Sequence, residues 1–340
     1  SRAMGIRWHY SPTFDLPKDI RWGRVYETFS DDPRRAGALG SAYIRGLQFT
    51  SEDNNHLNVL ATAKHFAGLG SMTWGTSTND DYRIDQGTIP RNESVLRNSL
   101  LPPYQAAIDA GAMSIMAGLA LWGDEAITGS TYLLTDVLKD EMKFTGFVVS
   151  DWYGIYSVPG GRYAATVASI NAGIDMAMLP FDYEWFAFDM KNAVMSGDIS
   201  RSRVDDAVRR ILRAKFRLGL FDELNASTPN VDVIGSAEHR ALAREAVQKS
   251  LVLLKNENVL PLSLDIERIH VAGSAADNIG RQAGGWTVEW QGIDGNWLPG
   301  ATSLLTGIRN SASAQTVVDY QMDGNFPSDS MADVGIAIVG

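Results

Sequence analysis

The 340-residue sequence contains no cysteine. A disulfide framework, a thiolate metal site and a cysteine nucleophile are therefore excluded as explanations of its function. The compartment stays open, because many secreted bacterial enzymes also lack disulfides.

Positive charge is scarce as well. The chain has 30 Lys and Arg against 40 Asp and Glu, which gives a formal net charge of −10. Nucleic-acid binding needs clustered Lys and Arg to meet the phosphates. We therefore expect no nucleic-acid partner, and a neutral substrate fits the balance better than an acidic one.

Long apolar runs are also missing. The longest one, around residues 112–122, is too short to span a bilayer, and no signal peptide or lipidation motif is visible. No membrane partner is expected. The chain begins at Ser1 and ends on a run that reads as a buried strand, residues 334–340. We expect both ends to be cut from a longer protein, so the lack of a leader says nothing about localisation.

What the sequence does contain is an alternation of strand-like and helical patterns. Strands are expected at 6–10, 61–66, 113–117, 147–149 and 175–178, and helices at 32–50, 93–110, 132–141, 164–172, 183–196 and 201–218. Repeated β–α units imply a parallel sheet. At this length the pattern favours the α/β class and a (β/α)8 barrel without its first units, with an open doubly wound sheet as the alternative. No G-x-G-x-x-G follows a strand, so a dinucleotide site is not supported.

The alternating pattern stops after about two thirds of the chain, and this change predicts the domain boundaries. Residues 1–221 are predicted to be the barrel domain and residues 222–255 a polar linker with a connecting helix. Residues 256–340, with strands at 269–272, 316–320 and 334–339 and a helix at 303–310, are predicted to begin a second α/β domain.

Asp151 is the first candidate for chemistry. It follows the apolar run Phe147-Val148-Val149 and precedes Trp152. In a barrel the carboxyl end of a strand faces the active site, so Asp151 is placed where a nucleophile or a base would be. Most aspartates after a strand cap a helix or sit in a loop, and position alone leaves that reading open.

Lys64 and His65 end a second predicted strand, before Gly68. Both can donate hydrogen bonds of the kind that sugar hydroxyls accept. A surface lysine beside a partly buried histidine is the structural alternative.

Two further segments are rich in arginine or tryptophan. Arg24 lies in a stretch dense in Arg, Trp and acidic residues and could fork onto two hydroxyls, or onto neighbouring carboxylates. Trp286 and Trp290 follow a glycine pair in a loop, where an indole face could stack on a sugar ring or pack on a neighbouring domain.

Together, and in this order, the four segments resemble glycoside hydrolase family 3, in its β-glucosidase and exo-β-glucanase branch. The matching motifs are W-G-R-x-x-E-x-F/Y-S-E-D-P with Arg24, K-H-F-x-G with Lys64 and His65, S-D-W with Asp151 and Trp152, and G-G-W-T-x-x-W-Q-G with Trp286 and Trp290. The resemblance covers essentially all 340 residues.

The resemblance implies a retaining, exo-acting β-glycosidase that removes terminal β-D-glucosyl residues from β-glucosides or β-glucans. Asp151 would be the nucleophile that forms a covalent glycosyl ester. The substrate-binding residues would be Arg24, Lys64 and His65 at the hydroxyls of the terminal sugar, Met116 as a subsite-lining residue, and Trp152 and Trp290 on the two sides of the next sugar. Trp286, in the same loop as Trp290, would also bind substrate. It further implies a barrel followed by an (α/β)6 sandwich, no metal or other cofactor, and a periplasmic or extracellular location.

Several positions depart from the family pattern. Leu69 stands where an aspartate is frequent, residues 85–88 lack a second aspartate, and residues 73–83 look like an insertion. The acid/base of this branch is a glutamate that follows a buried strand of the second domain. We expect it immediately after Gly340, so the 340-residue chain alone is expected to be inactive.

Three alternatives accompany the leading hypothesis. One is a β-xylosidase and another a β-N-acetylglucosaminidase of the same family. The second of these lacks support, because no K-H-F-P-G-H-G with a following D-S-H is present. The third is a non-catalytic glycan-binding relative, against which the intact Asp151, Lys64 and His65 argue.

Overall fold

A computed structural model describes residues 1–49, 56–222 and 231–340. The chain forms two compact units, Ser1–Leu242 and Ala243–Gly340. Each unit is described here by itself.

A five-stranded parallel sheet forms the centre of the first unit. Its order is β1-β2-β4-β7-β8, and each strand pairs with the next in parallel. The strands are β1 (Trp8–His9), β2 (Leu60–Phe66), β4 (Ser114–Ala117), β7 (Phe147–Trp152) and β8 (Met176–Met178). The sheet curls like half of a barrel, which confirms the predicted α/β class and the incomplete barrel.

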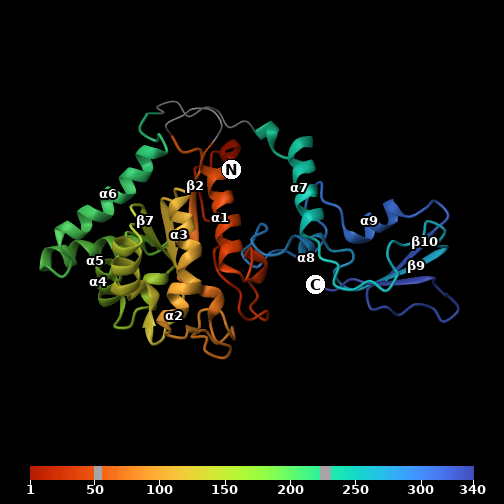
Figure 1. The fold of residues 1–340 in the computed structure, drawn as a ribbon, viewed down its shortest axis with the longest axis horizontal. Coiled ribbons are helices and arrows are strands. Elements are labelled where there is room, and N and C mark those ends of the chain that lie inside the picture. Colours follow the sequence, from red (N-terminus) through yellow and green to blue (C-terminus); the bar gives the residue numbers. More distant parts are fainter. Residues whose placement is uncertain (50–55, 223–230) are drawn as a thin grey trace. The chain divides into compact units, whose positions relative to one another are not determined.

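Helices follow the strands as the periodicity predicts (Figure 1). They are α1 (Pro33–Gln48), α2 (Glu93–Val95) continued by η4 (Leu96–Leu100) and α3 (Leu101–Asp109), η6 (Tyr132–Glu141), α4 (Arg162–Ala172), α5 (Tyr183–Ser196) and α6 (Arg201–Arg217). Short 3-10 turns complete the unit, at η1 (Arg2–Met4), η2 (Val25–Glu27), η3 (Leu69–Ser71), η5 (Ile127–Gly129), η7 (Gly154–Ser157) and η8 (Val231–Val233), with a small sheet of β3 (Thr88–Ile89), β5 (Leu121–Trp122) and β6 (Glu125–Ala126).

Capping explains where α1 begins. Asp32 has extended backbone, its side chain accepts from the Arg35 amide at 2.8 Å, and Pro33 opens the helix. An acceptor at this position satisfies an amide that has no partner within the helix. The predicted end at residue 50 lies outside the described residues.

Alternation along the strands separates two hydrophobic cores. Ala61 and Ala63 of β2 belong to the large core formed with α1, α3 and η6, whereas Leu60 of β2 belongs to a second core. In that second core, Ala214 and Leu218 pack with apolar side chains of β4 and β7. Helices α1, α3 and η6 therefore cover one face of the sheet, and α6 packs against side chains of the other face.

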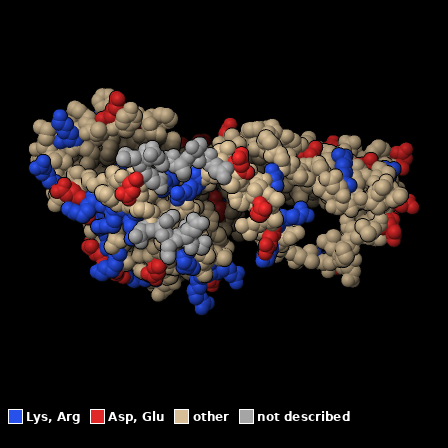
Figure 2. All heavy atoms as spheres, turned by 90° about the horizontal axis from the view of Figure 1, so that it is seen from above, with Lys and Arg blue, Asp and Glu red and all other residues tan. Residues whose placement is uncertain are grey.

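Charge on the face drawn in Figure 2 is mixed. Lys and Arg side chains gather over the first unit with Asp and Glu among them, and α6 is rich in arginine.

The second unit contains α7 (Ala237–Ser250), which begins in the first unit, and a three-stranded parallel sheet of order β10-β9-β11. Its other elements are β9 (Arg268–Ala272), α8 (Ile279–Ala283), α9 (Leu304–Ser311), β10 (Val317–Gln321) and β11 (Val334–Ala337). The strands agree with the predicted start of a second α/β domain. The expectation that the last strand is buried is wrong for the described residues: β11 is exposed or half-buried, and among them it pairs with β9 only. Part of the predicted linker, residues 223–230, lies outside the described residues.

Candidate active site

Asp151 lies near the carboxyl end of β7, directly after four buried residues. Its side chain is 17% exposed, and the Trp152 amide donates to its Oδ1 at 2.6 Å. The strand thus fixes the carboxylate at the edge of the sheet where barrel enzymes place their catalytic groups.

Lys64 and His65 reach the same edge from β2. The pairing of β2 with β4 shifts register between Ala63 and Phe66, so regular alternation is interrupted at this pair. Both side chains are buried, and His65 Nε2 lies 3.8 Å from Asp151 Oδ2. The structure therefore brings together the two strand ends that the sequence singled out.

Arg24 joins this cluster from the loop before η2. Its Nε and Nη2 donate to the two carboxylate oxygens of Glu27 at 2.7 and 3.1 Å, and Nη2 also lies 3.0 Å from His65 Nε2. Lys64 Nζ lies 3.9 Å from the same Glu27 carboxylate. Glu27 is 7% exposed, so this paired carboxylate holds both cations beside the site.

Burial dominates the electrostatics of Asp151. Desolvation raises the pKa of Asp151, against the Trp152 amide and the charges of Arg24 and Lys64, which lower it. The two cations favour the ionised carboxylate, but burial outweighs them, and His65 is not among the causes of the shift.

His65 stays neutral for a related reason. Burial lowers the pKa of His65 well below its ordinary value, and the charges of Arg24 and Lys64 lower it further. Burial also lowers the pKa of Lys64, although the carboxylates of Glu27 and Asp151 oppose the change. The cluster thus presents donors and a neutral ring beside a carboxylate, an arrangement suited to hydroxyl groups.

Asp85 is a second acid near Asp151. It accepts from the buried Trp22 indole at 2.9 Å, and its charge contributes to the raised pKa of Asp151. The segment that departs from the family pattern therefore borders the candidate site.

Met116 and Trp152 differ in exposure. Met116 is 3% exposed and belongs to the second core, with Phe147 and Val149. Trp152 is 53% exposed and meets Phe181 edge to face, with ring centroids 6.3 Å apart. Trp152 therefore has surface available for stacking, and the subsite roles of both residues remain predictions.

Trp286 and Trp290 belong to the second unit. The Trp286 amide donates to the Trp290 carbonyl at 2.9 Å, the ring centroids are 6.4 Å apart, and both side chains are about half exposed. The loop presents two indoles side by side, and their role in binding sugar remains a prediction.

Sequence reasoning missed Asp15. This aspartate lies beside β2, where Phe14 pairs with Lys64, and its Oδ2 is 2.7 Å from His65 Nδ1. A carboxylate between the apolar residues Phe14 and Leu16 was a local signal of burial. Glu27 stood in a quoted motif but received no role.

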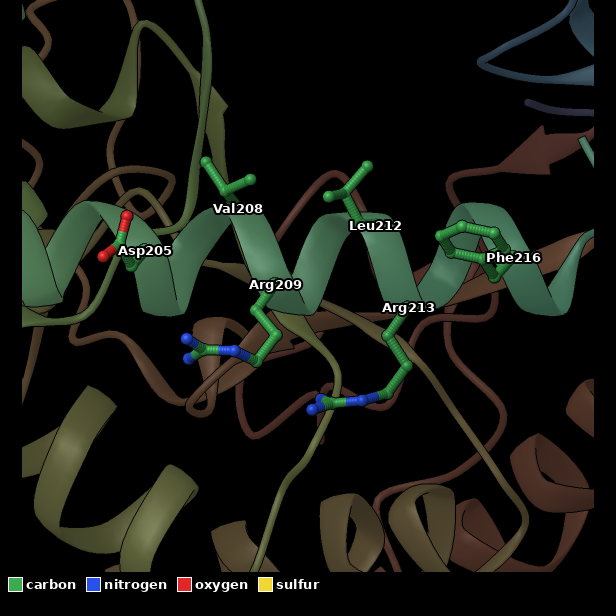
Figure 3. Close-up of a pocket in the computed structure, with 6 residues that line it drawn as sticks. All are labelled: Asp205, Val208, Arg209, Leu212, Arg213 and Phe216. Atoms are coloured by element: carbon green, nitrogen blue, oxygen red, sulfur yellow. The ribbon is translucent and has the colours of Figure 1, made fainter. Parts of the chain in front are cut away.

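A shallow hollow elsewhere does not compete with this site. All its lining residues belong to α6 (Figure 3): Asp205, Val208, Arg209, Leu212, Arg213 and Phe216. Side chains from a single helix do not point their polar groups toward one ligand. In the part of the chain that the structure describes, no three potential ligands cluster as a metal site would require.

Comparison with known proteins decides the family. Residues 1–214 match the glycosyl hydrolase family 3 N-terminal domain, and residues 251–340 match its C-terminal domain. The chain belongs to glycosyl hydrolase family 3. The resemblance inferred from the four motifs is thereby confirmed.

Individual relatives of this family 3 chain are named as β-glycosidases. It is 36% identical to a lysosomal beta glucosidase of Dictyostelium discoideum over 90% of this chain and 38% of that protein. It is 33% identical to a beta-xylosidase of Formosa agariphila over 94% of this chain and 45% of that protein. The chain spans less than half the length of these relatives.

Solved structures agree. An exo-1,3/1,4-beta-glucanase from a Pseudoalteromonas species superimposes with a TM-score of 0.89 at 39% identity, covering 99% of this chain and 42% of that one. A beta-glucosidase from Listeria innocua in complex with glucose gives 0.79 at 29% identity, covering 93% of this chain and 42% of that one.

Proposed function

We propose that the full-length protein is a retaining, exo-acting β-glycosidase that hydrolyses terminal β-D-glucosyl residues, with Asp151 as nucleophile. The observation that carries the proposal is the Asp151 carboxylate at the end of β7, 3.8 Å from His65 and beside Lys64 and Arg24. The names of the relatives, a beta glucosidase and an exo-1,3/1,4-beta-glucanase among them, support the reaction class.

The chemistry follows from the position of the carboxylate. An oxygen of ionised Asp151 donates its electron pair to the anomeric carbon, the bond to the leaving oxygen breaks, and that oxygen takes a proton from an acid. Water then attacks the same carbon of the glycosyl ester, loses its proton to the conjugate base, and releases Asp151 as a carboxylate. Two inversions retain the configuration. We assign no described residue as the acid.

The donors beside Asp151 have a separate task. Arg24 and Lys64 can only donate hydrogen bonds, so they favour a ligand that is rich in hydroxyl oxygens. Their charges also hold down the pKa of Asp151, which must be ionised to attack. Neutral β-glucosides and β-glucan oligosaccharides satisfy both conditions.

Chemical rescue tests the proposal. In the full-length protein, Asp151→Ala should abolish turnover of an aryl β-glucoside, and azide should restore part of it as the inverted glycosyl azide. Asp85→Ala is the matched control, because Asp85 is an acid near Asp151 that azide should not replace. Near-wild-type turnover by Asp151→Ala would show that another residue is the nucleophile.

A β-xylosidase is the second candidate, since the Formosa agariphila relative carries that name. The two sugars differ in the substituent on C5, so rates on paired aryl β-glucoside and β-xyloside substrates separate them. A higher kcat/KM for the xyloside would replace glucose as the proposed sugar.

We also propose a periplasmic or extracellular location. A relative from Salmonella typhimurium, 30% identical, is named a periplasmic beta-glucosidase. Within the described residues, every helix is too short or too polar to cross a membrane. Fractionation of cells that express the full-length protein would test the location.

A further inference from the structure

One buried carboxylate stands directly behind the candidate site. The Asp15 side chain is 0% exposed, and its Oδ2 accepts from the His65 backbone amide at 3.2 Å and lies 2.7 Å from His65 Nδ1. The Asp15 segment continues β1 along β2, through a parallel bridge between Thr13 and Lys64. Backbone pairing thus fixes the carboxylate at one ring nitrogen of His65.

The other ring nitrogen faces a group that can only donate. Arg24 Nη2 lies 3.0 Å from His65 Nε2, and a guanidinium has no acceptor. His65 Nε2 must therefore accept. A neutral imidazole carries one proton, so that proton belongs on Nδ1, where Asp15 accepts it.

We propose that Asp15 is a positioning residue that holds His65 in the Nδ1-protonated tautomer, so that the Nε2 lone pair points into the site. The inference rests on the proposed function, in which a sugar binds beside Asp151. It goes further by naming the direction of the hydrogen bond: a sugar hydroxyl that meets His65 donates to Nε2 and replaces the Arg24 donor there.

The same tautomer protects the nucleophile. Asp151 Oδ2 lies 3.8 Å from His65 Nε2. A proton on Nε2 would compete for the lone pairs with which Asp151 attacks, and it would also face the donors of Arg24. With the proton held on Nδ1, Asp151 keeps these lone pairs for the anomeric carbon.

Among the described residues, the charged or titratable groups that face His65 are Asp15, Arg24, Lys64 and Asp151. Burial raises the pKa of Asp15 to about 7, although Arg24 and the His65 amide lower it. Above this pH Asp15 is ionised and can accept the hydrogen bond from His65 Nδ1. The tautomer should therefore be examined at a pH of about 8.

The direct test is nitrogen NMR of the full-length protein with histidine-selective ¹⁵N labelling, using His65→Gln to assign the signal. In the wild type we expect a protonated Nδ1 and an unprotonated Nε2 on His65. A proton on Nε2 in the wild type would overturn the proposal. This readout needs no turnover, so it stands apart from any failure of the proposed function.

Two variants with the same branched side-chain shape test the acceptor. Asp15→Leu removes it and should shift the His65 proton toward Nε2 and lower kcat/KM for an aryl β-glucoside by up to about 100-fold, as expected when a reacting group is misplaced. Asp15→Asn keeps an oxygen for Nδ1–H and should restore most of both properties. Unchanged tautomer and unchanged kcat/KM in Asp15→Leu would contradict the assignment.

Tyr104→Phe is the control for disturbance of the buried neighbourhood. Tyr104 is fully buried, and its pKa is raised well above its ordinary value by burial and then by the charge of Asp15, so it lies close to this carboxylate. The variant leaves Asp15 as acceptor and should keep the tautomer and most of kcat/KM. A shift of the His65 proton in Tyr104→Phe as large as in Asp15→Leu would contradict the role given to Asp15.

Discussion

Two clusters of buried charge lie at opposite ends of the five-stranded sheet. At the amino end of the strands, Lys139 of η6 donates to Asp175 at 2.8 Å and to the Gly173 carbonyl at 2.7 Å. Arg203 of α6 also pairs with Asp175, and the Val148 amide donates to its second oxygen at 2.8 Å. This cluster links η6, the residue directly before β8, and α6.

The cluster at the carboxyl end is arranged differently. Arg24 forks onto Glu27 rather than onto Asp151, and the nearest ring nitrogen of His65 stays 3.8 Å from the Asp151 carboxylate. Asp175 is fully buried as a side chain, whereas Asp151 keeps 17% of its surface. The difference indicates how a fold can separate a structural acid from one that is proposed to react. Asp175 is saturated with direct donors, whereas the cations near Asp151, Arg24 and Lys64, are paired with Glu27.

The largest effect should come from Asp151→Asn. We expect kcat to fall by roughly 10⁴-fold or more, as is typical when a nucleophile is removed. Stability near neutral pH should stay equal or rise, because burial raises the pKa of Asp151 and its charge therefore costs folding free energy. Steady-state kinetics and urea unfolding of the full-length protein check the two halves. A clear loss of stability would mean that Asp151 is a structural acid like Asp175.

Asp175→Ala should lower the stability of the fold and leave kcat nearly unchanged. Removing one partner of a buried pair leaves Lys139 and Arg203 without their shared carboxylate and should cost about 3–5 kcal/mol of unfolding free energy. The kcat of the remaining folded protein should change little. Asp206→Ala is the matched control, since Asp206 joins the same cluster but its side chain is 34% exposed, and it should cost less. Equal costs for the two variants would contradict the central place given to Asp175.

Lys64→Met should move the acidic limb of kcat/KM to higher pH. The charge of Lys64 lowers the pKa of Asp151, so its removal raises that pKa further, and the nucleophile becomes ionised only at a higher pH. Lys64→Arg keeps the charge and should leave the limb nearer its wild-type position. The pH profile of kcat/KM on an aryl β-glucoside checks the shift. A limb that moves to lower pH would refute the electrostatic coupling.

Local sequence signals account for the elements and for the first members of the site. Apolar runs before Asp151 and Lys64 predicted β7 and β2, and parallel pairing then brings their ends together. Asp32 followed by Pro33 is also a local signal, of the kind that begins a helix such as α1. What escaped the sequence is pairing across the chain. The Asp15 carboxylate contacts His65, which lies fifty residues away in the sequence. No local pattern around either residue predicts this contact.

Exposure escaped the sequence for a similar reason. Apolar runs predict that a strand exists, but its burial depends on which elements cover it, as the edge strand β11 shows. Met116 illustrates the same limit, because its packing with Phe147 and Val149 in a core could not be read from the sequence, and its subsite role remains a prediction. The network of Lys139, Asp175 and Arg203 joins three separate elements and left no motif at all.

The smallest effect should be the change that Lys139→Met makes in the pH dependence of stability. Burial lowers the pKa of Lys139 from 10.5 to about 8, although Asp175 opposes the change. The unfolded chain therefore binds more protons than the folded one between these two values, and stability rises with pH across this window. In Lys139→Met this contribution disappears, so the wild type should gain stability relative to the variant as the pH rises from about 8 toward 10.5. Urea unfolding at several pH values measures the difference.

Lys249→Met, which changes an exposed lysine of α7, should leave the wild-type dependence of stability on pH intact. The acidic limb of kcat/KM should also stay in place in Lys139→Met, since this lysine belongs to the opposite end of the sheet from Asp151. A limb that moved as far as in Lys64→Met would mean that the two clusters act as one.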